Sequence, residues 1–175
     1  MILKRKKIIG ISGSLRSNSS ASAVLEVVSN LVPGHVAFTV FTGLVEIPPF
    51  NDSGQAPLPV ANFIKLITES DAVFFCIPEY AFGVPGALKN ALDWTVSSTA
   101  FSGKPVALIT AASSGDKAHA ALLLTLSALD TKIADGTTLL ISFVRSKLNE
   151  KGEVKDIPTF NAIKKVIGTL IQTIE

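Results

Sequence analysis

Residues 72–94 read AVFFCIPEYAFGVPGALKNALDW, and this stretch decides the class of fold. It begins with a continuous apolar run, crosses a turn of proline and glycine, and continues with apolar residues at helical spacing. A strand without polar alternation is typical of a parallel sheet that is buried on both faces. The stretch therefore predicts one strand-to-helix unit of an α/β protein.

The rest of the chain repeats this unit. Four more apolar runs predict strands: KIIGISG at 7–13, VAFTVFT at 36–42, PVALITA at 105–111 and TTLLISF at 137–143. Amphipathic segments between and after the five strands predict five helices. Five strands with crossover helices predict a doubly wound parallel sheet of order 2-1-3-4-5, with helices on both faces, in a single domain over residues 1–175.

The composition limits the class of protein. A chain of 175 residues with one cysteine fits a domain without disulfides or metal staples, and it predicts a reducing compartment. We expect Cys76 to be a buried thiol, because it lies inside an apolar strand. No apolar stretch approaches the roughly 20 residues of a membrane-spanning helix, so we expect a soluble, cytoplasmic protein.

The charge distribution argues against a signal peptide and against a nucleic-acid-binding protein. The net charge is +2 at pH 7, and the cluster Lys4, Arg5, Lys6 and Lys7 lies at one end. Residues 1–7 resemble the start of a signal peptide, but the apolar part after them soon breaks into glycine and serine, so we expect a solvated tip. No basic stripe with interleaved aromatic residues is present, and we expect no nucleic-acid partner. The sequence predicts no metal site.

The strand order also predicts where a ligand binds. In a doubly wound sheet the ligand lies beyond the carboxyl ends of the strands, at the point where the strand order reverses. Here that point falls between the first and third strands, which are followed by SGSLRSNSSAS at 12–22 and PEYAFGVPG at 78–86. The longest irregular stretch, residues 42–59, is predicted to be a functional surface loop.

The loop after the first strand has the composition of an anion site. Besides the cation Arg16, it carries the polar residues Ser12, Ser14, Ser17, Asn18, Ser19 and Ser20. Backbone N–H groups at a helix start, the helix dipole and a guanidinium group favour a phosphate dianion. The alternative is that one serine caps the helix and the others belong to a solvated loop.

Other familiar motifs are absent. No lysine followed by serine or threonine closes a glycine-flanked turn, and Gly10 and Gly13 lack the dinucleotide spacing, so a mononucleotide remains. The serine-nucleophile spacing is also missing, and neither histidine lies near a promising serine in sequence. We expect His35 and His119 to be surface or loop residues.

The turn in the opening stretch is suited to a flat ring. Pro78, Glu79 and Tyr80 follow the third strand, and Gly83 and Gly86 shape the turn before the next helix. Glycine lets the backbone approach a ligand closely, and tyrosine offers a stacking face or edge. The alternative is a plain strand-to-helix connection in which Tyr80 is a packing residue.

These motifs resemble those of the NADPH-dependent FMN reductase family, the small flavodoxin-like quinone, azo and chromate reductases. The resemblance lies in GSLR and SNSS at 13–20, PEY at 78–80 and GVPGALKNALDW at 83–94, with EIPPFND at 46–52 and GKPVALITAASSG at 103–115. It implies a flavodoxin-like fold with bound FMN. It also implies that hydride passes from NAD(P)H through FMN to a quinone, azo, flavin or metal-oxyanion acceptor in ping-pong turnover. No catalytic side chain is implied, because FMN carries the chemistry.

The resemblance also implies which residues bind the cofactor. The phosphate would be held by Ser14, Arg16, Ser19 and Ser20. The ring would be bordered by Pro78, Glu79, Tyr80, Ala81 and Phe82, with Ser113, Ser114 and Gly115 on its other edge. A homodimer or homotetramer is implied, with a contact that includes Lys89, Asp93 and Trp94, although Lys89 and Asp93 could equally be an exposed helix pair.

Two departures keep other functions open. The family usually has asparagine at the positions of Ala21 and Ala81, so two polar side chains are missing here. A non-enzymatic flavin-binding electron carrier or redox sensor is one alternative. Electron-carrying flavodoxins resemble this fold but are typically strongly acidic, whereas this chain has a net charge of +2. A flavin-free scaffold that keeps only the fold is the other.

Overall fold

The computed structural model describes residues 5–16, 18–52 and 54–175. Its centre is a five-stranded parallel sheet of order β2-β1-β3-β4-β5. The strands are β1 (Lys6–Ser12), β2 (Val36–Phe41), β3 (Ala72–Ile77), β4 (Val106–Ala111) and β5 (Thr138–Ile141). The predicted fold class and strand order are confirmed, and each strand overlaps the apolar run that predicted it.

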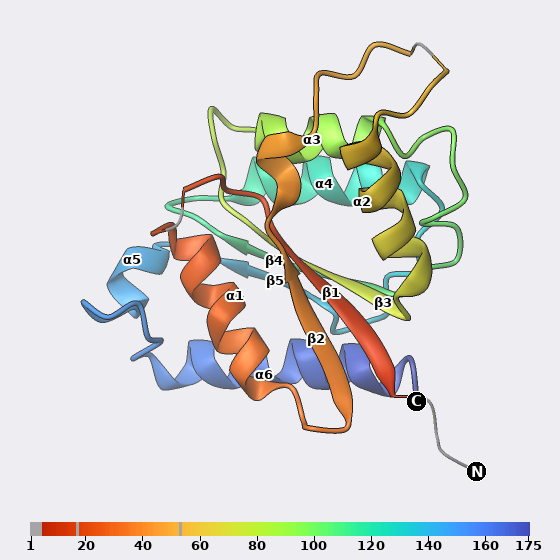
Figure 1. The fold of residues 1–175 in the computed structure, drawn as a ribbon. Coiled ribbons are helices and arrows are strands. Elements are labelled where there is room, and N and C mark those ends of the chain that lie inside the picture. The colour runs from red at the N-terminus through yellow and green to blue at the C-terminus, as the bar shows by residue number, and fades with distance from the viewer. Residues whose placement is uncertain (1–4, 17, 53) are drawn as a thin grey trace.

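Helices cover both faces of the sheet (Figure 1). The helices on one face are α1 (Ser20–Leu31) and α6 (Ile157–Gln172). The helices on the other face are α2 (Leu58–Glu69), α3 (Gly86–Asp93) and α4 (Asp116–Ala128). These are the five predicted helices. Two short elements are not predicted by the sequence, η1 (Gly43–Glu46) and α5 (Val144–Lys147), because one helical turn is too short to show a hydrophobic period.

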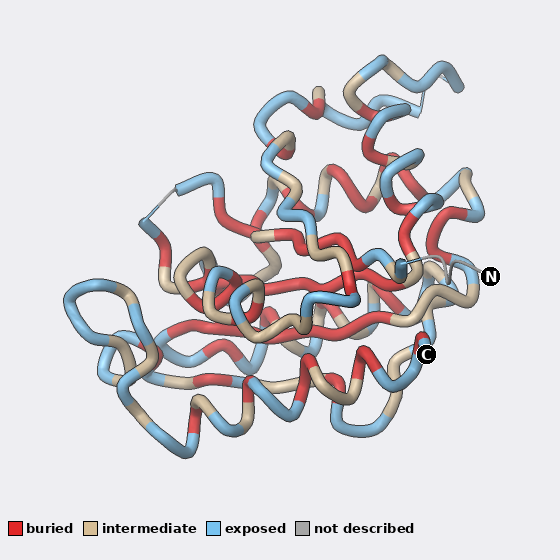
Figure 2. The backbone as a smooth tube through the Cα atoms, turned by 60° about the horizontal axis from the view of Figure 1, so that its bottom comes forward, coloured by how far each residue is buried: buried red, intermediate tan, exposed pale blue. Residues whose placement is uncertain are grey.

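The core lies on both faces of β3 and β4, whose residues are all buried. Neighbouring side chains of β3 point to opposite layers, as the pleat requires. Phe74 packs edge-on against Phe38 on the α1 and α6 side, and Phe75 stacks on Phe101 on the other side. Figure 2 shows the buried backbone running along these central strands. This double burial explains the continuous apolar runs, and it confirms that Cys76 is buried.

The predicted surface loop over residues 42–59 is mostly exposed among its described residues, but its first half is anchored to the core. Leu44 and Ile47 are buried against the core. The carbonyl of Pro48 accepts hydrogen bonds from the Asn90 side chain at 2.9 Å and from the Trp94 indole at 2.8 Å. Apolar burial and these bonds anchor the segment to α3. Ser53, in the second half, lies outside the described residues.

The first strand begins one residue earlier than predicted. Lys6 and Lys7 belong to β1, where the Lys7 N–H donates to the Asp71 carboxylate at 2.8 Å, and the Lys7 side chain is exposed. Residues 1–4, including Lys4, lie outside the described residues. Within the part of the chain that the structure describes, no helix is long and apolar enough to cross a membrane.

Candidate active site

The loops after β1 and β3 lie side by side, as predicted. The Gly13 N–H donates to the carbonyl of Cys76 at 2.9 Å, which continues the β1–β3 pairing by one residue. A Cβ atom at Gly13 would lie 2.9 Å from the side chain of Ile77, closer than real Cβ contacts allow. Glycine at this position therefore lets the first loop leave the sheet directly against the end of β3.

The first loop leads into a capped helix. The Ser19 hydroxyl accepts a hydrogen bond from the Ser22 N–H at 3.0 Å, so Ser19 is the N-cap of α1. The capping alternative is thus correct for this serine. The loop is not simply solvated, however, because Ser14 and Ser19 are buried and Ser20 is half-buried. Ser17 lies outside the described residues.

Arg16 has an exposed guanidinium group. Its backbone N–H donates to the Ser14 hydroxyl at 3.1 Å, and this fixes the turn that carries the side chain. No hydrogen bond or ion pair from the guanidinium reaches any described residue. The cation next to the start of α1 is therefore available to an anion, and the dipole of α1 acts in the same direction.

A side-chain contact joins the first two loops. The hydroxyl groups of Ser14 and Tyr80 are 3.0 Å apart. Beyond Tyr80, the chain makes a tight turn in which Tyr80 and Gly83 exchange two backbone hydrogen bonds. Ala81 and Phe82 form its tip with φ of 48° and 57°, a left-handed conformation that costs free energy for residues other than glycine. The Phe82 ring is 75% exposed.

Glu79 joins the second loop to the third, a role that the sequence does not predict. Its carboxylate oxygens accept hydrogen bonds from the N–H groups of Gly115, at 3.2 Å, and Ala118, at 2.9 Å. These amides belong to the N-cap and first turn of α4, where a negative charge is favourable. Glu79 therefore caps α4 and fixes the loop of Ser113 and Ser114.

The three loops surround one cleft of about 280 Å³. Every predicted binding residue lines it except Ser14, Ala81 and Gly115, which lie beside it. Val144 and Arg145 of α5 also line it, although nothing in the sequence predicts this for either residue. A larger cleft of about 530 Å³ lies between β2 and α2, but none of the predicted residues lines it. A third cleft, of about 430 Å³, borders the far side of the first loop and lacks the second and third loops.

The two histidines lie outside this cleft. His35 is exposed, as expected, and its ring nitrogen lies 3.1 Å from the Glu175 carboxylate. The expectation is wrong for His119, which lies on α4, is half-buried and forms a 2.9 Å hydrogen bond with Thr110. Burial lowers the pKa of His119.

The prediction that Trp94 contributes to a dimer contact is wrong. Its side chain is buried within the chain, where the ring packs edge-on against Phe50 at 5.1 Å. Lys89 and Asp93 form an ion pair of 2.6 Å on α3 and are partly exposed, which agrees with the exposed helix pair and leaves their part in a subunit contact as a prediction.

A family model for NADPH-dependent FMN reductase matches residues 6–145. The chain belongs to the NADPH-dependent FMN reductase family. The matched range contains the three loops, and it ends at Arg145. This match confirms the predicted enzyme class, an FMN-dependent oxidoreductase that uses NAD(P)H.

Full-length relatives agree with this assignment. The chain is 35% identical over 173 residues to the NAD(P)H-dependent FMN reductase PA1204 of Pseudomonas aeruginosa, covering 94% of this chain and 92% of that protein. It is 25% identical over 185 residues to a quinone reductase of Escherichia coli K12, covering 98% of each. Among solved structures, the flavoenzyme NAD(P)H:(acceptor) oxidoreductase FerB of Paracoccus denitrificans superposes with a TM-score of 0.82 at 26% identity over 97% of each chain.

Ala21, at a position where the family usually has asparagine, does not line the cleft. Ala21 is fully buried on α1, and its side chain belongs to the core between α1 and α6. The groups of the first loop that suit an anion are present beside the cleft: backbone N–H groups at the start of α1, hydroxyl groups and Arg16. The residues of the first loop fit a mononucleotide phosphate.

Proposed function

We propose that the chain is an FMN-dependent NAD(P)H oxidoreductase whose cofactor binds in the 280 Å³ cleft. One observation carries this proposal: a guanidinium group without a partner in the described residues and a strained aromatic turn meet at the strand-order reversal, linked by the Ser14–Tyr80 contact. The phosphate end would consist of Ser14, Arg16, Ser19 and Ser20. The ring would be bordered by residues 78–82 and 113–115.

In this proposal the side chains and backbone of the cleft bind and orient the cofactor, and they carry out no chemical step. When bound, FMN supplies hydride acceptance from NAD(P)H and electron transfer to a second substrate. Arg16 and the amides of α1 would neutralise the phosphate, while the caps formed by Ser19 and Glu79 hold the loops at the two ends of the cleft. His119 and Cys76 lie outside it, and we assign no acid or base role to any side chain.

We propose a quinone as the acceptor class, with azo compounds, free flavin and metal oxyanions as further acceptors. Two relatives support quinone and azo acceptors: the Escherichia coli protein is named quinone reductase, and a Bacillus protein that is 32% identical over 111 residues is named NADPH azoreductase. The cleft is small and borders exposed aromatic side chains, so the two substrates would have to bind in turn on one face of the ring. Ping-pong turnover follows.

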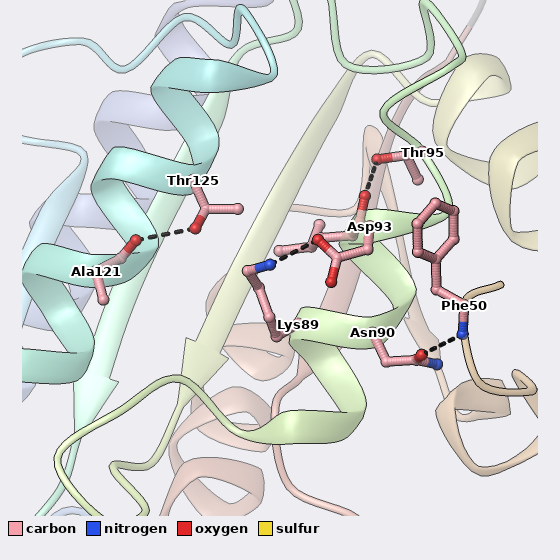
Figure 3. Close-up of polar contacts among 8 residues, drawn as sticks. Phe50, Lys89, Asn90, Asp93, Thr95, Ala121 and Thr125 are labelled. Carbon is pink, nitrogen blue, oxygen red and sulfur yellow. Dashed lines mark hydrogen bonds and ion pairs between the residues drawn. The ribbon is translucent and has the colours of Figure 1, made fainter. Parts of the chain in front are cut away.

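The chain would act as a cytoplasmic homodimer or homotetramer, with residues 1–175 forming one FMN-binding domain. The face formed by α3 and α4 is the proposed contact. Figure 3 shows the Lys89–Asp93 ion pair on α3 and the Thr125 side chain on α4. Val96, just after α3, and Leu124, on α4, are 68% and 74% exposed. A second subunit would also enlarge a cleft that lies just below the roughly 300–1,000 Å³ of common ligand sites.

Initial-rate kinetics test this function. NADPH or NADH would be varied at several fixed concentrations of a benzoquinone with the FMN-loaded protein. Parallel double-reciprocal lines are expected for ping-pong turnover, and intersecting lines would contradict it. A bound flavin that NAD(P)H does not reduce would instead favour the alternative of a carrier or sensor.

A further inference from the structure

We propose that Arg145 is a second cation for the FMN phosphate, acting together with Arg16. This inference rests on the proposed binding of FMN in the cleft. Arg145 lies on α5, just beyond the carboxyl end of β5, and it lines the same cleft as Arg16, Ser19 and Ser20. The two arginines are 129 positions apart, so their spacing in sequence gives no sign of a pair.

The element that carries Arg145 lies near the proposed phosphate end of the cleft. Figure 1 shows α5 beside the beginning of α1. The segment that follows α5, residues 148–152, lines a further cleft, distinct from the three described above, together with Asn18, Ser19 and Ser20. A Cβ atom at Gly152 would lie only 3.3 Å from the Ala23 side chain on α1. The neighbourhood of α5 is therefore the start of α1, where the phosphate is expected.

The backbone around Arg145 is held in place by the third loop. The N–H groups of Phe143 and Val144 donate to the carbonyls of Ser113, at 3.0 Å, and Ala112, at 3.1 Å. Phe143 has a left-handed φ of 53°, a conformation that needs such support, and Val144 is buried in the core. Arg145 thus lies on a turn that is held in place by the third loop, which borders the cleft.

The charge balance of the cleft favours a dianion. Among the described residues, the guanidinium groups of Arg16 and Arg145 have no carboxylate partner. Glu79, which also lines the cleft, directs its carboxylate oxygens to backbone N–H groups of α4. Lys147, two residues beyond Arg145, is instead paired with Asp156 at 3.5 Å. A phosphate monoester carries about −1.5 to −2 charges at pH 7, so it suits two guanidinium groups better than one.

The test compares ligands with and without the phosphate. Dissociation constants of FMN and riboflavin would be measured by fluorescence quenching on flavin-stripped wild type, Arg16→Gln, Arg145→Gln, Arg145→Lys and Lys164→Gln. Lys164 is the matched control, because it is an exposed cation on α6, away from the first and third loops. Arg145→Gln is expected to weaken FMN binding about tenfold or more and to leave riboflavin binding within about twofold. Arg145→Lys should restore part of the loss, and Lys164→Gln should change little.

Several outcomes would overturn the proposal. Equal losses for FMN and riboflavin would mean that Arg145 acts on the ring or on the fold. Unchanged FMN binding in Arg145→Gln, with or without a raised KM for NADPH, would remove Arg145 from the phosphate site while the proposed function stands. A wild type that binds neither flavin would instead refute the proposed function itself.

Discussion

The hydroxyl groups of Ser14 and Tyr80 lie 3.0 Å apart although 66 positions separate the two residues in sequence. This contact joins the proposed phosphate end of the cleft to the proposed ring end. Tyr80→Phe removes it and keeps the aromatic ring. We expect the free energy of unfolding to fall by about 0.5–1.5 kcal/mol, the usual net value of one hydrogen bond, and FMN affinity to fall several-fold. Urea denaturation and FMN titration would measure both, and an unchanged pair of values would show that the contact is incidental.

Glu79 is expected to matter for the order of the third loop. Glu79→Gln keeps the size of the side chain but removes its charge from the start of α4, so we expect a loss of about 1–2 kcal/mol in unfolding free energy. The amides of Gly115 and Ala118 should exchange with deuterium faster than in the wild type. Glu46→Gln, outside this network, is the control. Equal exchange rates in the two variants would contradict the capping role.

Ala81 provides a test of backbone strain. Its φ of 48° suits glycine or asparagine better than alanine. Ala81→Gly should therefore stabilise the protein, by about 0.5–1 kcal/mol. Ala23→Gly, on α1, should destabilise it by a similar amount, since glycine is a poor helix former. Thermal unfolding compares the two variants, and a destabilised Ala81→Gly would mean that the turn at residues 80–83 is not strained.

His119 predicts a dependence of stability on pH. Burial lowers its pKa in the folded state below the usual value near 6.5. Below that value the unfolded chain binds the proton and the folded chain resists it, so stability is lost as the pH falls from about 7 toward the folded pKa. His119→Gln should flatten the slope of unfolding free energy between about pH 7 and 5.5. Identical slopes would show that His119 does not contribute.

Cys76 should be chemically inert in the folded protein. It is fully buried in β3, and burial raises the pKa of its thiol, so little thiolate is present at neutral pH. We expect no reaction with a disulfide reagent under native conditions and reaction of one thiol after denaturation. Rapid labelling of the native protein would contradict the burial.

The sequence predicts the sheet well because the signal for each strand is local. Double burial makes β3 and β4 continuously apolar, and the strand order then follows from the number of strand-helix units. Crossover topology likewise predicts which two loops meet, and the contact between Ser14 and Tyr80 agrees with it.

The contacts that the sequence misses are long-range ones. Glu79 caps a helix 36 and 39 positions away, and nothing near Glu79 in sequence indicates this. Trp94 follows the amphipathic helix α3, and the family resemblance implies a subunit contact for it. Instead its indole donates to the Pro48 carbonyl and packs against the Phe50 ring, residues more than 40 positions away. Arg145 sits on a single helical turn that has no period to detect. Such residues are found only when the folded chain brings distant segments together.

Binding of FMN in the cleft and its reduction by NADPH can be measured together. The most direct measurement is a titration of FMN into flavin-stripped protein, followed by flavin fluorescence, with NADPH then added without oxygen. We expect saturable quenching at one FMN per chain, then bleaching of the bound flavin absorbance. Absence of saturable binding, or bound flavin that stays oxidised in excess NADPH and NADH, would contradict the proposed function.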